Sequence, residues 1–260
     1  MAISELLQVS ARLKVDLPWI VEAKYFDKVD STQSRIIQWL PKLADGAVVV
    51  IGETQSKGVG RQGREWISPP GGLWFTLALP LSDISIEKIG AFSLVTALQV
   101  SNALKEVNNL ECQVKWPNDI LAEGKKVAGI LLSTTTKYKK DWLLIGVGVN
   151  VNNAIPKELS QIAIAIKDIR KQTQGRSRLL EAVLSAIYTA WKDYPSTGFG
   201  PYQKAFETKL FGIGKKTKVQ MGDKTIQGTL SSVDTEGNLL LESASGIKKV
   251  YAGEIVGQPA

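Results

Sequence analysis

A glycine-rich segment with two arginines is the part of the sequence best suited to chemistry. It spans residues 53–66 (ETQSKGVGRQGREW) and follows an apolar run, AVVVIG, at residues 47–52. Glycines let backbone amides approach a ligand closely, and the guanidinium groups of Arg61 and Arg64 match the oxygens of a phosphate or a carboxylate. The segment therefore predicts an anion-binding loop that follows a strand.

The glycine spacing alone also fits dinucleotide-binding and protein-kinase loops, but the context of both is missing. A dinucleotide-binding turn opens a helix, whereas this chain continues into SPPGG at residues 68–72, which stops a helix. A kinase needs an H-R-D motif, and the sequence has no histidine and no GxxxxGK[ST] P-loop. A plain surface loop is the remaining alternative, and the interleaved arginines and Trp66 make it the weaker one.

Further motifs carry polar residues beside apolar runs. Residues 114–120 read VKWPNDI, residues 124–132 read GKKVAGILL, and residues 145–150 read IGVGVN. With DSTQ at residues 30–33 and the glycine-rich segment, these motifs resemble the biotin protein ligase family in order and spacing over roughly residues 24–258. The pairing of K-W-P-N-D with K-x-x-G-I-L is the most specific part of the resemblance.

The resemblance implies an ATP- and Mg²⁺-dependent reaction in two steps. Biotin and ATP give biotinoyl-5′-AMP and pyrophosphate, and a lysine of a biotin carboxyl carrier protein then takes the biotinoyl group. Both steps concentrate negative charge on phosphate oxygens, so positioning and preorganised charge can provide the rate. The absence of histidine excludes Ser-His-Asp and Cys-His schemes.

The resemblance implies roles for specific residues of this sequence. Lys126 and Arg61 are expected to be catalytic, and Asp119 is the motif carboxylate expected to hold Mg²⁺. Residues expected to contact biotin are Ser31, Thr32, Gln33, Gln55, Gly58, Val59, Gly60, Arg61, Lys126, Gly129 and Gly148. Those expected to contact ATP or the adenylate are Arg61, Arg64, Trp66, Asn118, Lys126 and Asn150.

Simpler structural roles remain open for many of these residues. Lys126 can belong to a solvated hairpin pair with Lys125, and a glycine such as Gly129 can mark a bulge. The remaining residues with such an alternative are Ser31 and Thr32 as helix caps, Asn118 and Asn150 in turns, and Trp66 and Trp116 in the core. Val59 and Gln258 stand where members of the family have arginine, so the anion contacts of the loop and the contribution of the C-terminus to ATP binding stay open.

Hydrophobic periodicity predicts an α+β fold with a mixed sheet and flanking helices, which the resemblance makes a class II synthetase-like catalytic domain. From Lys215 apolar residues alternate with polar ones, which predicts a small β-barrel, SH3-like by resemblance. We expect a helical lead-in at 1–23, a catalytic domain at 24–212 and the barrel at 213–260. Strands are expected at 25–29, 47–53, 73–79, 111–116, 126–134 and 142–151, and helices at 31–41, 86–107 and within 158–206, with Ser177 as a cap.

The composition indicates which partners and which cellular location to expect. The net charge of +7 comes from dispersed lysines rather than a stripe, so specific DNA binding is not expected. A lone Cys112 excludes an intrachain disulfide, and the start of the chain has no signal-peptide pattern, so we expect a cytoplasmic protein without a membrane span.

Two other functions remain as alternatives. One is a lipoate ligase or octanoyl transferase, which shares the catalytic fold. The other is a biotin-responsive repressor, disfavoured because about 24 residues before Tyr25 are too few for a winged helix-turn-helix. The resemblance also allows a homodimer.

Overall fold

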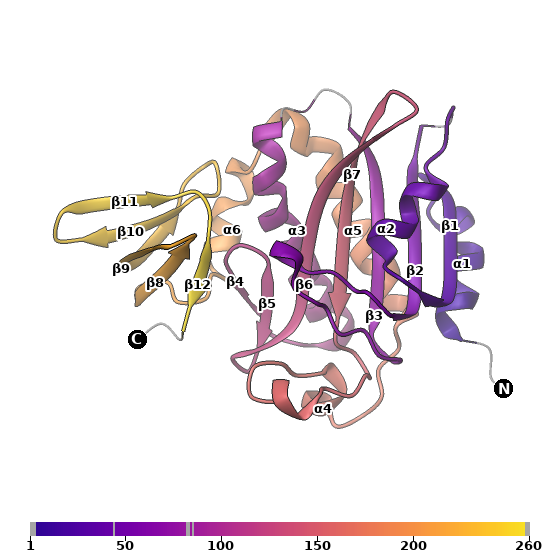
Figure 1. Cartoon of the computed structure of the whole chain (residues 1–260), viewed down its shortest axis with the longest axis horizontal. Helices are drawn as coiled ribbons and strands as arrows, with labels where there is room; N and C mark the ends of the chain where they lie inside the picture. Colours follow the sequence, from indigo (N-terminus) through magenta and orange to yellow (C-terminus); the bar gives the residue numbers. More distant parts are fainter. Residues whose placement is uncertain (1–3, 44, 82–83, 85, 258–260) are drawn as a thin grey trace.

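A computed structural model describes residues 4–43, 45–81, 84 and 86–257, so Gln258 lies outside the described residues. The larger of two sheets has the strand order β1-β2-β3-β7-β6-β5-β4, in which β1 and β2 are parallel and all other neighbours antiparallel (Figure 1). Its strands are β1 (Ile20–Val29), β2 (Ala47–Gln55), β3 (Leu73–Leu81), β4 (Gln113–Lys115), β5 (Asp119–Ala122), β6 (Lys125–Lys137) and β7 (Lys140–Val149).

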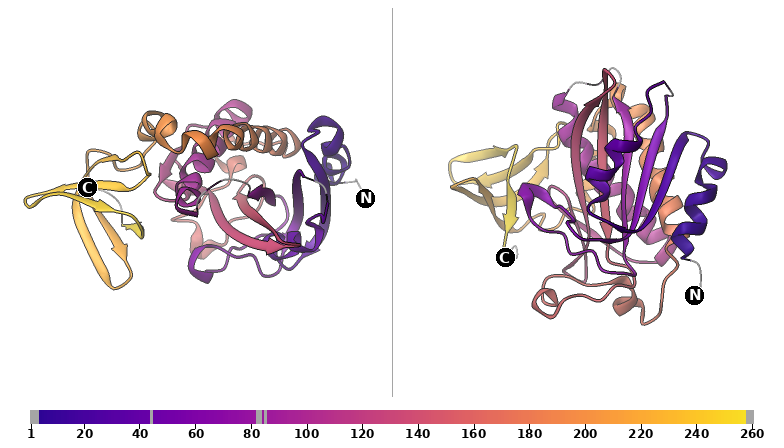
Figure 2. Two further views of the ribbon diagram at one scale, coloured as in Figure 1. Left: turned by 90° about the horizontal axis from the view of Figure 1, so that it is seen from above. Right: turned by 45° about the vertical axis from the view of Figure 1, so that its right-hand side comes forward.

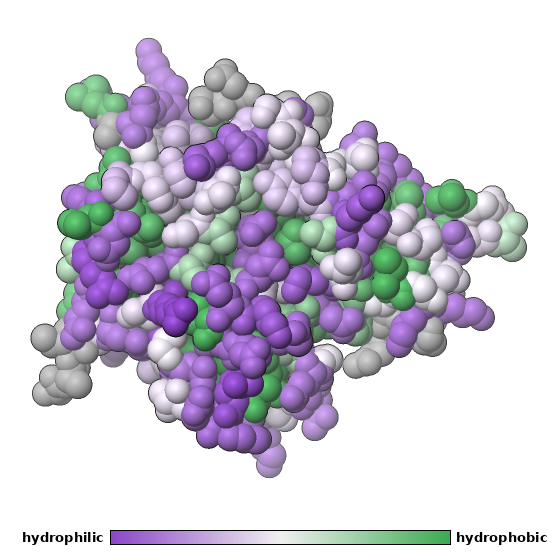
Figure 3. All heavy atoms as spheres, turned by 180° about the vertical axis from the view of Figure 1, so that it is seen from behind, coloured by the Kyte–Doolittle hydropathy of each residue, from purple (hydrophilic) through white to green (hydrophobic). Residues whose placement is uncertain are grey.

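Three helices cover one face of this sheet: α1 (Glu5–Asp16), α3 (Ile86–Asn108) and α5 (Ser177–Thr197) (Figures 1 and 2). Alternate residues of the strands, such as Ile51 of β2 and Phe75 of β3, bury their side chains with α3 and α5 in the main core. On the outer side of this layer hydrophilic residues predominate and hydrophobic ones form small groups (Figure 3). Within the described residues, every helix is too short or too polar to cross a membrane.

The opposite face of the sheet is only partly covered. The short α2 (Thr32–Arg35) and the 3-10 helix η1 (Ile36–Trp39) pack on it over a second, smaller core that includes Val48, Val50 and Trp142. The glycine-rich segment, with the 3-10 helix η2 (Arg61–Gly63), passes over the rest of this face without filling the space above it. A ligand can reach the backbone of the sheet in this space between the segment and the strands.

The C-terminal residues form a second, antiparallel sheet of strand order β11-β10-β9-β8-β12, which stands beside the first domain (Figure 2). The indole of Trp116 donates a hydrogen bond to the carbonyl of Gly237, 3.1 Å away, and so joins the two domains. The strands are β8 (Lys216–Met221), β9 (Lys224–Val233), β10 (Leu239–Ser243), β11 (Gly246–Val250) and β12 (Glu254–Val256).

The α+β fold and the small C-terminal β domain are confirmed, whereas several details of the prediction are wrong. The first strand begins at Ile20, and the helix expected at 31–41 is divided into α2 and η1. The strand β5 (Asp119–Ala122) is not among the predicted strands, because it is only four residues long. Trp116 is a buried core residue.

The helical block expected at 158–206 is several separate helices: η3 (Lys157–Leu159), α4 (Ile166–Arg170), α5, η4 (Gly200–Tyr202) and α6 (Gln203–Glu207). Ser177 is the first residue of α5 rather than its cap, and its hydroxyl donates to the carbonyl of Glu5. The division at residues 23 and 212 remains a prediction.

Candidate active site

A cavity of about 480 Å³ lies between the uncovered face of the sheet, the glycine-rich segment and the chain that follows β7. That volume is in the range of small-molecule sites. The predicted residues that line it are Ser31, Thr32, Gln33, Gln55, Val59, Gly60, Arg61, Arg64, Trp66, Asn118, Asp119, Lys126, Gly129, Gly148 and Asn150.

Gly58 is the predicted residue that the cavity lining does not include. A Cβ atom at this position would lie 2.3 Å from the carbonyl oxygen of Trp66, and the amide of Trp66 donates to the carbonyl of Gly58. Gly58 therefore allows the two sides of the loop to pass close together, which is a structural reason for glycine here.

One group of polar side chains gathers where α2 meets the sheet. Gln55 accepts hydrogen bonds at Oε1 from the amide and the hydroxyl of Thr32, at 2.8 and 3.1 Å, and donates to Ser68. Gln33 donates to the hydroxyl of Ser133, 2.8 Å away. These contacts fix the side-chain amides in defined orientations beside the cavity.

Ser31 stands at the N-terminal end of α2 but does not cap it. Its side chain makes no capping hydrogen bond, and the Oγ atom is buried without a hydrogen-bond partner among the described residues. A buried hydroxyl without a partner costs free energy. Because Ser31 also lines the cavity, its hydroxyl is available to a polar group of a ligand.

A second, charged group lies on β5 and β6. Lys126 Nζ is 2.6 Å from Asp119 Oδ1, and it also lies 4.8 Å from the ring centroid of Trp66. Arg61 donates to Asn118 Oδ1 at 3.1 Å. A lysine and an arginine thus reach the cavity from different segments of the chain.

The two loop arginines contact the C-terminal domain. Arg64 forms an ion pair with Glu254 of β12, and Arg61 lies 3.8 Å from the same carboxylate oxygen. Burial lowers the pKa of Arg61 and the charge of Arg64 lowers it further, while Glu254 and Asp119 act in the opposite direction. A phosphate in the cavity would have to compete with Glu254 for these guanidinium groups.

Trp66 lies against two glycines that face each other on neighbouring strands. Gly129 of β6 pairs with Gly148 of β7, and Cβ atoms there would lie 2.9 and 2.6 Å from the Trp66 ring. Only glycine leaves room for the indole at both positions. The Trp66 Nε1 atom is buried without a hydrogen-bond partner within the described residues.

The two asparagines bond to the backbone of the sheet. Asn118 donates from Nδ2 to the carbonyl of Ile130 at 2.9 Å, while its Oδ1 accepts from Arg61. Asn150 donates from Nδ2 to the carbonyl of Lys126 at 3.5 Å and accepts at Oδ1 from the side chain of Asn153 at 3.0 Å. Both therefore fill structural roles and line the cavity at the same time.

Sequence reasoning missed three parts of the site. Gly146 belongs to the IGVGVN motif at residues 145–150, so its spacing could have identified it; a Cβ atom there would lie 2.6 Å from Gln33 Oε1. Glu254 gave no signal, because its partners are far away in the sequence. The apolar wall after β7 carries no residue types suggestive of chemistry: Ala154, Ile155, Pro156, Leu159, Ile162 and Ala163.

Asp119 is the residue expected to hold Mg²⁺. In the part of the chain that the structure describes, no cluster of three or more metal-binding side chains is present. Mg²⁺ commonly uses one or two carboxylates together with waters and substrate phosphates. Asp119 fits such a partial site, because its carboxylate lines the cavity beside Lys126.

Comparison with known proteins agrees with this geometry. Residues 25–150 match the biotin/lipoate A/B protein ligase family, and residues 212–256 match the biotin protein ligase C-terminal domain. The bifunctional ligase/repressor BirA of Bacillus subtilis is 33% identical over 238 residues, which cover 89% of this chain and 72% of the relative. The biotin–[acetyl-CoA-carboxylase] ligase of Mycobacterium tuberculosis is 29% identical over 245 residues, covering 90% of this chain and 89% of that protein.

A solved structure extends the likeness to three dimensions. The biotin protein ligase of Aquifex aeolicus, in complex with biotin and ATP, has a TM-score of 0.79 and 31% identity to this chain, covering 90% of this chain and 97% of the other. Both domains and nearly the whole of that ligase are therefore represented here. On these grounds the chain belongs to the biotin protein ligase family and is an enzyme of that family.

Proposed function

We propose that this protein activates biotin with MgATP and transfers it to a lysine of a biotin carboxyl carrier domain. The observation that carries the proposal is one cavity that holds both a fixed group of uncharged polar side chains and a group of cations. The uncharged group suits the ureido ring of biotin. The cations suit a carboxylate and a phosphate.

The ureido ring offers two N–H donors and one carbonyl acceptor, and all three need partners when buried. The free hydroxyl of Ser31 can donate to the carbonyl or accept from an N–H group. Thr32 and Gln55 lie beside it and bond to each other, and Gln33 is oriented by Thr76, from which it accepts, and by Ser133, to which it donates. This arrangement supports a rigid polar ligand at that end of the cavity.

The order of the two groups along β7 suits a ligand with a polar ring and a distant carboxylate. Gln33 lies against Gly146, Trp66 lies against Gly148, and Asn150 follows at the end of the strand beside Lys126. A ligand lying along this line would meet the ureido partners first, then Trp66, and finally the cations. The valeryl chain of biotin would span the glycine pair.

In the first step a carboxylate oxygen of biotin bonds to the α-phosphorus of ATP, and the bond to the β-phosphate oxygen breaks, releasing pyrophosphate. Lys126 and Arg61 are placed to stabilise the negative charge that develops on the phosphate oxygens. Magnesium held beside Asp119 would neutralise phosphate charge when bound. In the second step a lysine amine bonds to the biotinoyl carbonyl carbon, loses a proton, and AMP leaves.

The proposed function also implies an acceptor protein and a cellular location. The proposed acceptor is a carrier domain of a biotin-dependent carboxylase. We propose that the enzyme acts in the cytoplasm and recognises no specific DNA sequence. A homodimer is one proposed state, which size-exclusion chromatography would reveal. Lipoate is the alternative substrate, because the matching family includes lipoate ligases.

The decisive experiment measures pyrophosphate release with MgATP and either biotin or lipoate, followed by addition of a carrier domain. Release with biotin and labelling of one carrier lysine are expected. Release with lipoate and none with biotin would reject the substrate assignment. Much tighter binding to one DNA sequence than to unrelated sequences at the same salt concentration would reject the proposal that the chain lacks specific DNA recognition.

A further inference from the structure

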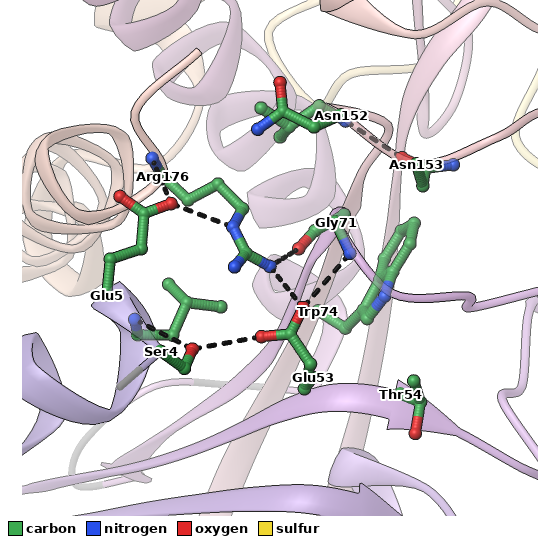
Figure 4. A network of polar contacts seen from close by, with 12 residues as sticks. Ser4, Glu5, Glu53, Thr54, Gly71, Trp74, Asn152, Asn153 and Arg176 are labelled. Atoms are coloured by element: carbon green, nitrogen blue, oxygen red, sulfur yellow. Dashed lines mark hydrogen bonds and ion pairs between the residues drawn. The ribbon is translucent and has the colours of Figure 1, made fainter. Parts of the chain in front are cut away.

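Outside the cavity, a buried ionic network surrounds Arg176, the residue just before α5. The side chain of Arg176 is only 10% exposed, and it lies between two carboxylates (Figure 4). Its NH1 nitrogen is 2.7 Å from Glu53 Oε1, and its Nε is 2.9 Å from Glu5 Oε1. Three segments far apart in the sequence meet at one guanidinium group.

This network holds both ends of the loop that connects β2 to β3, residues 56–72, which contains most of the glycine-rich segment. Glu53 lies near the end of β2, where this loop begins, and its Oε1 atom accepts from the amide of Gly71 at 3.1 Å. Arg176 NH1 donates to the carbonyl of Gly72 at 3.0 Å, just before β3 begins. One arginine–glutamate pair therefore fixes the entrance and the exit of the loop relative to each other.

The end of the β2–β3 loop, at Gly71, also supports the other wall of the cavity. The amide of Asn152 donates to the carbonyl of Gly71 at 2.8 Å, and its side chain exchanges two hydrogen bonds with the backbone of Gln174. Gly71 has a φ of +93°, and a Cβ atom there would lie 3.0 Å from the backbone of Asn152. The chain after β7, which lines the cavity, is thus attached to the base of the loop.

Stability alone is a weak reason for this ion pair. Removing two charges from water costs free energy that their attraction often only balances, and apolar residues of similar size are frequently as stable. What such a pair provides is a defined geometry, because its directional hydrogen bonds hold the guanidinium group and the carboxylates in one arrangement. Burial alone would raise the pKa of Glu53, but the hydrogen bonds from Arg176 and Gly71 outweigh it and lower that pKa.

We propose that Arg176 and Glu53 are positioning residues, which hold the base of the glycine-rich loop so that Arg61, Arg64 and Trp66 retain the adenylate. Neither is among the described residues that line the cavity, so both act through the loop. The inference rests on the adenylate-forming reaction proposed above. A loop whose ends shift by about 1 Å can lose on the order of a hundredfold in a positioned step.

The test compares the release of preformed biotinoyl-adenylate from Arg176→Met, Arg176→Lys, Glu53→Gln and the double variant Arg176→Met/Glu53→Gln. Radiolabelled adenylate is formed on the enzyme and its release followed after addition of excess unlabelled biotin. The matched control is Arg12→Met, because Arg12 also bridges α1 to α5, through Glu181 at 2.7 Å, but lies on the surface. Thermal unfolding confirms that each variant is folded at the assay temperature.

We expect release to be about ten- to a hundredfold faster for Arg176→Met and Glu53→Gln, with partial rescue in Arg176→Lys. The double variant should be no worse than the more severe single one, since both remove the same contact. Parent-like release from the folded variants, or equally fast release from Arg12→Met, would overturn the inference. If Arg176→Met does not fold, Glu53→Gln and Arg176→Lys decide by the same criterion.

The two proposals can fail separately. A parent enzyme that forms no adenylate would reject the proposed function, and the positioning role with it. A parent that forms and retains adenylate, beside variants that retain it equally well, would reject the positioning role alone.

Discussion

Lys126 and Asp119 face each other across β6 and β5, with the lysine Nζ 2.6 Å from the carboxylate Oδ1. The pair places a cation and an anion at the edge of the same cavity. An incoming phosphate can replace Asp119 as the partner of the lysine, which frees the carboxylate for a metal ion.

Replacing Lys126 by alanine should reduce the rate of adenylate formation about 100- to 1000-fold, the usual effect of losing one preorganised charge at a developing anion. Pyrophosphate release with biotin and MgATP measures this rate. The control is Lys125→Ala: this neighbouring lysine donates to the carbonyl of Ser160 at 2.7 Å and does not line the described cavity. Equal losses at the two positions would show a general effect of charge and no special role for Lys126.

Arg61→Gly should separate adenylate formation from adenylate retention. Lys126 and its surroundings remain in this variant, so some adenylate still forms, but one clamp on the phosphate is gone. A mixed anhydride must be kept from water and from stray amines. We therefore expect faster release and biotin labelling of bystander proteins, measured by blotting with streptavidin. A release rate equal to that of the parent enzyme would leave Arg61 without this role.

Gly148→Ala should weaken biotin binding with little loss of stability. The new methyl group would lie 2.6 Å from Trp66 Nε1, and the indole can move away because it is carried by a loop. The methyl group would still occupy the place proposed for the valeryl chain of biotin, and crowding of this kind costs about 1–3 kcal/mol, so binding weaker by roughly tenfold is expected in calorimetry. Gly90→Ala on α3 is the control, because a Cβ atom there meets nothing within 4 Å. Unchanged biotin affinity in Gly148→Ala would show that the ligand does not approach this pair of glycines.

Glu254→Gln should expose the glycine-rich loop to trypsin. Arg64 and Arg61 both lie near the Glu254 carboxylate, so its neutralisation removes the ion pairs that tie the loop to the C-terminal domain. Cleavage after these arginines should become several times faster in the enzyme without ligands, as followed by mass spectrometry. The control is Glu236→Gln, whose carboxylate pairs with Lys249 in the same domain. Identical cleavage of the loop in both variants would argue against this tether.

The pKa of Glu53 predicts how stability changes with pH. Because the folded protein lowers this pKa, the ionised carboxylate contributes stability above the pKa of the unfolded chain, ~4.3, and loses it as the pH falls through the lower folded value. The parent should therefore exceed Glu53→Gln in free energy of unfolding at pH 7, and the difference should shrink below pH ~4. Urea unfolding at several pH values measures it. Glu158→Gln, at an exposed position, serves as the control, and a difference that stays constant with pH would contradict the prediction.

Local patterns in the sequence were sufficient for most of the architecture. The helix α3 was predictable because apolar residues recur at helical spacing over many turns, and β2 because it is a continuous apolar run before glycines. The strand β5 was not, since it is only four residues long and overlaps the end of the K-W-P-N-D motif, so it gives no periodic signal. The helical region after residue 158 was misread because short helices and turns have similar composition.

For the site, the motifs indicated which residues gather but not how they pair. Lys126 and Asp119 belong to separate motifs, and their contact depends on the register of β5 against β6. The partnership of Glu53 with Arg176 spans 123 positions, and Arg176 lies in none of the motifs, so only the folded chain reveals it. Glu254 reaches the loop arginines only because the C-terminal domain brings β12 next to the glycine-rich segment.

The position of Trp66 against Gly129 and Gly148 has a kinetic consequence. A ligand that is to lie along the glycine pair must wait for the indole to leave, so its entry is an exchange between two occupants of the same space. The observed rate of association should then rise with ligand concentration only until it reaches the rate at which the indole departs. A stopped-flow trace that levels off in this way would make the time scale of a single side chain the upper limit on how fast the enzyme can be loaded.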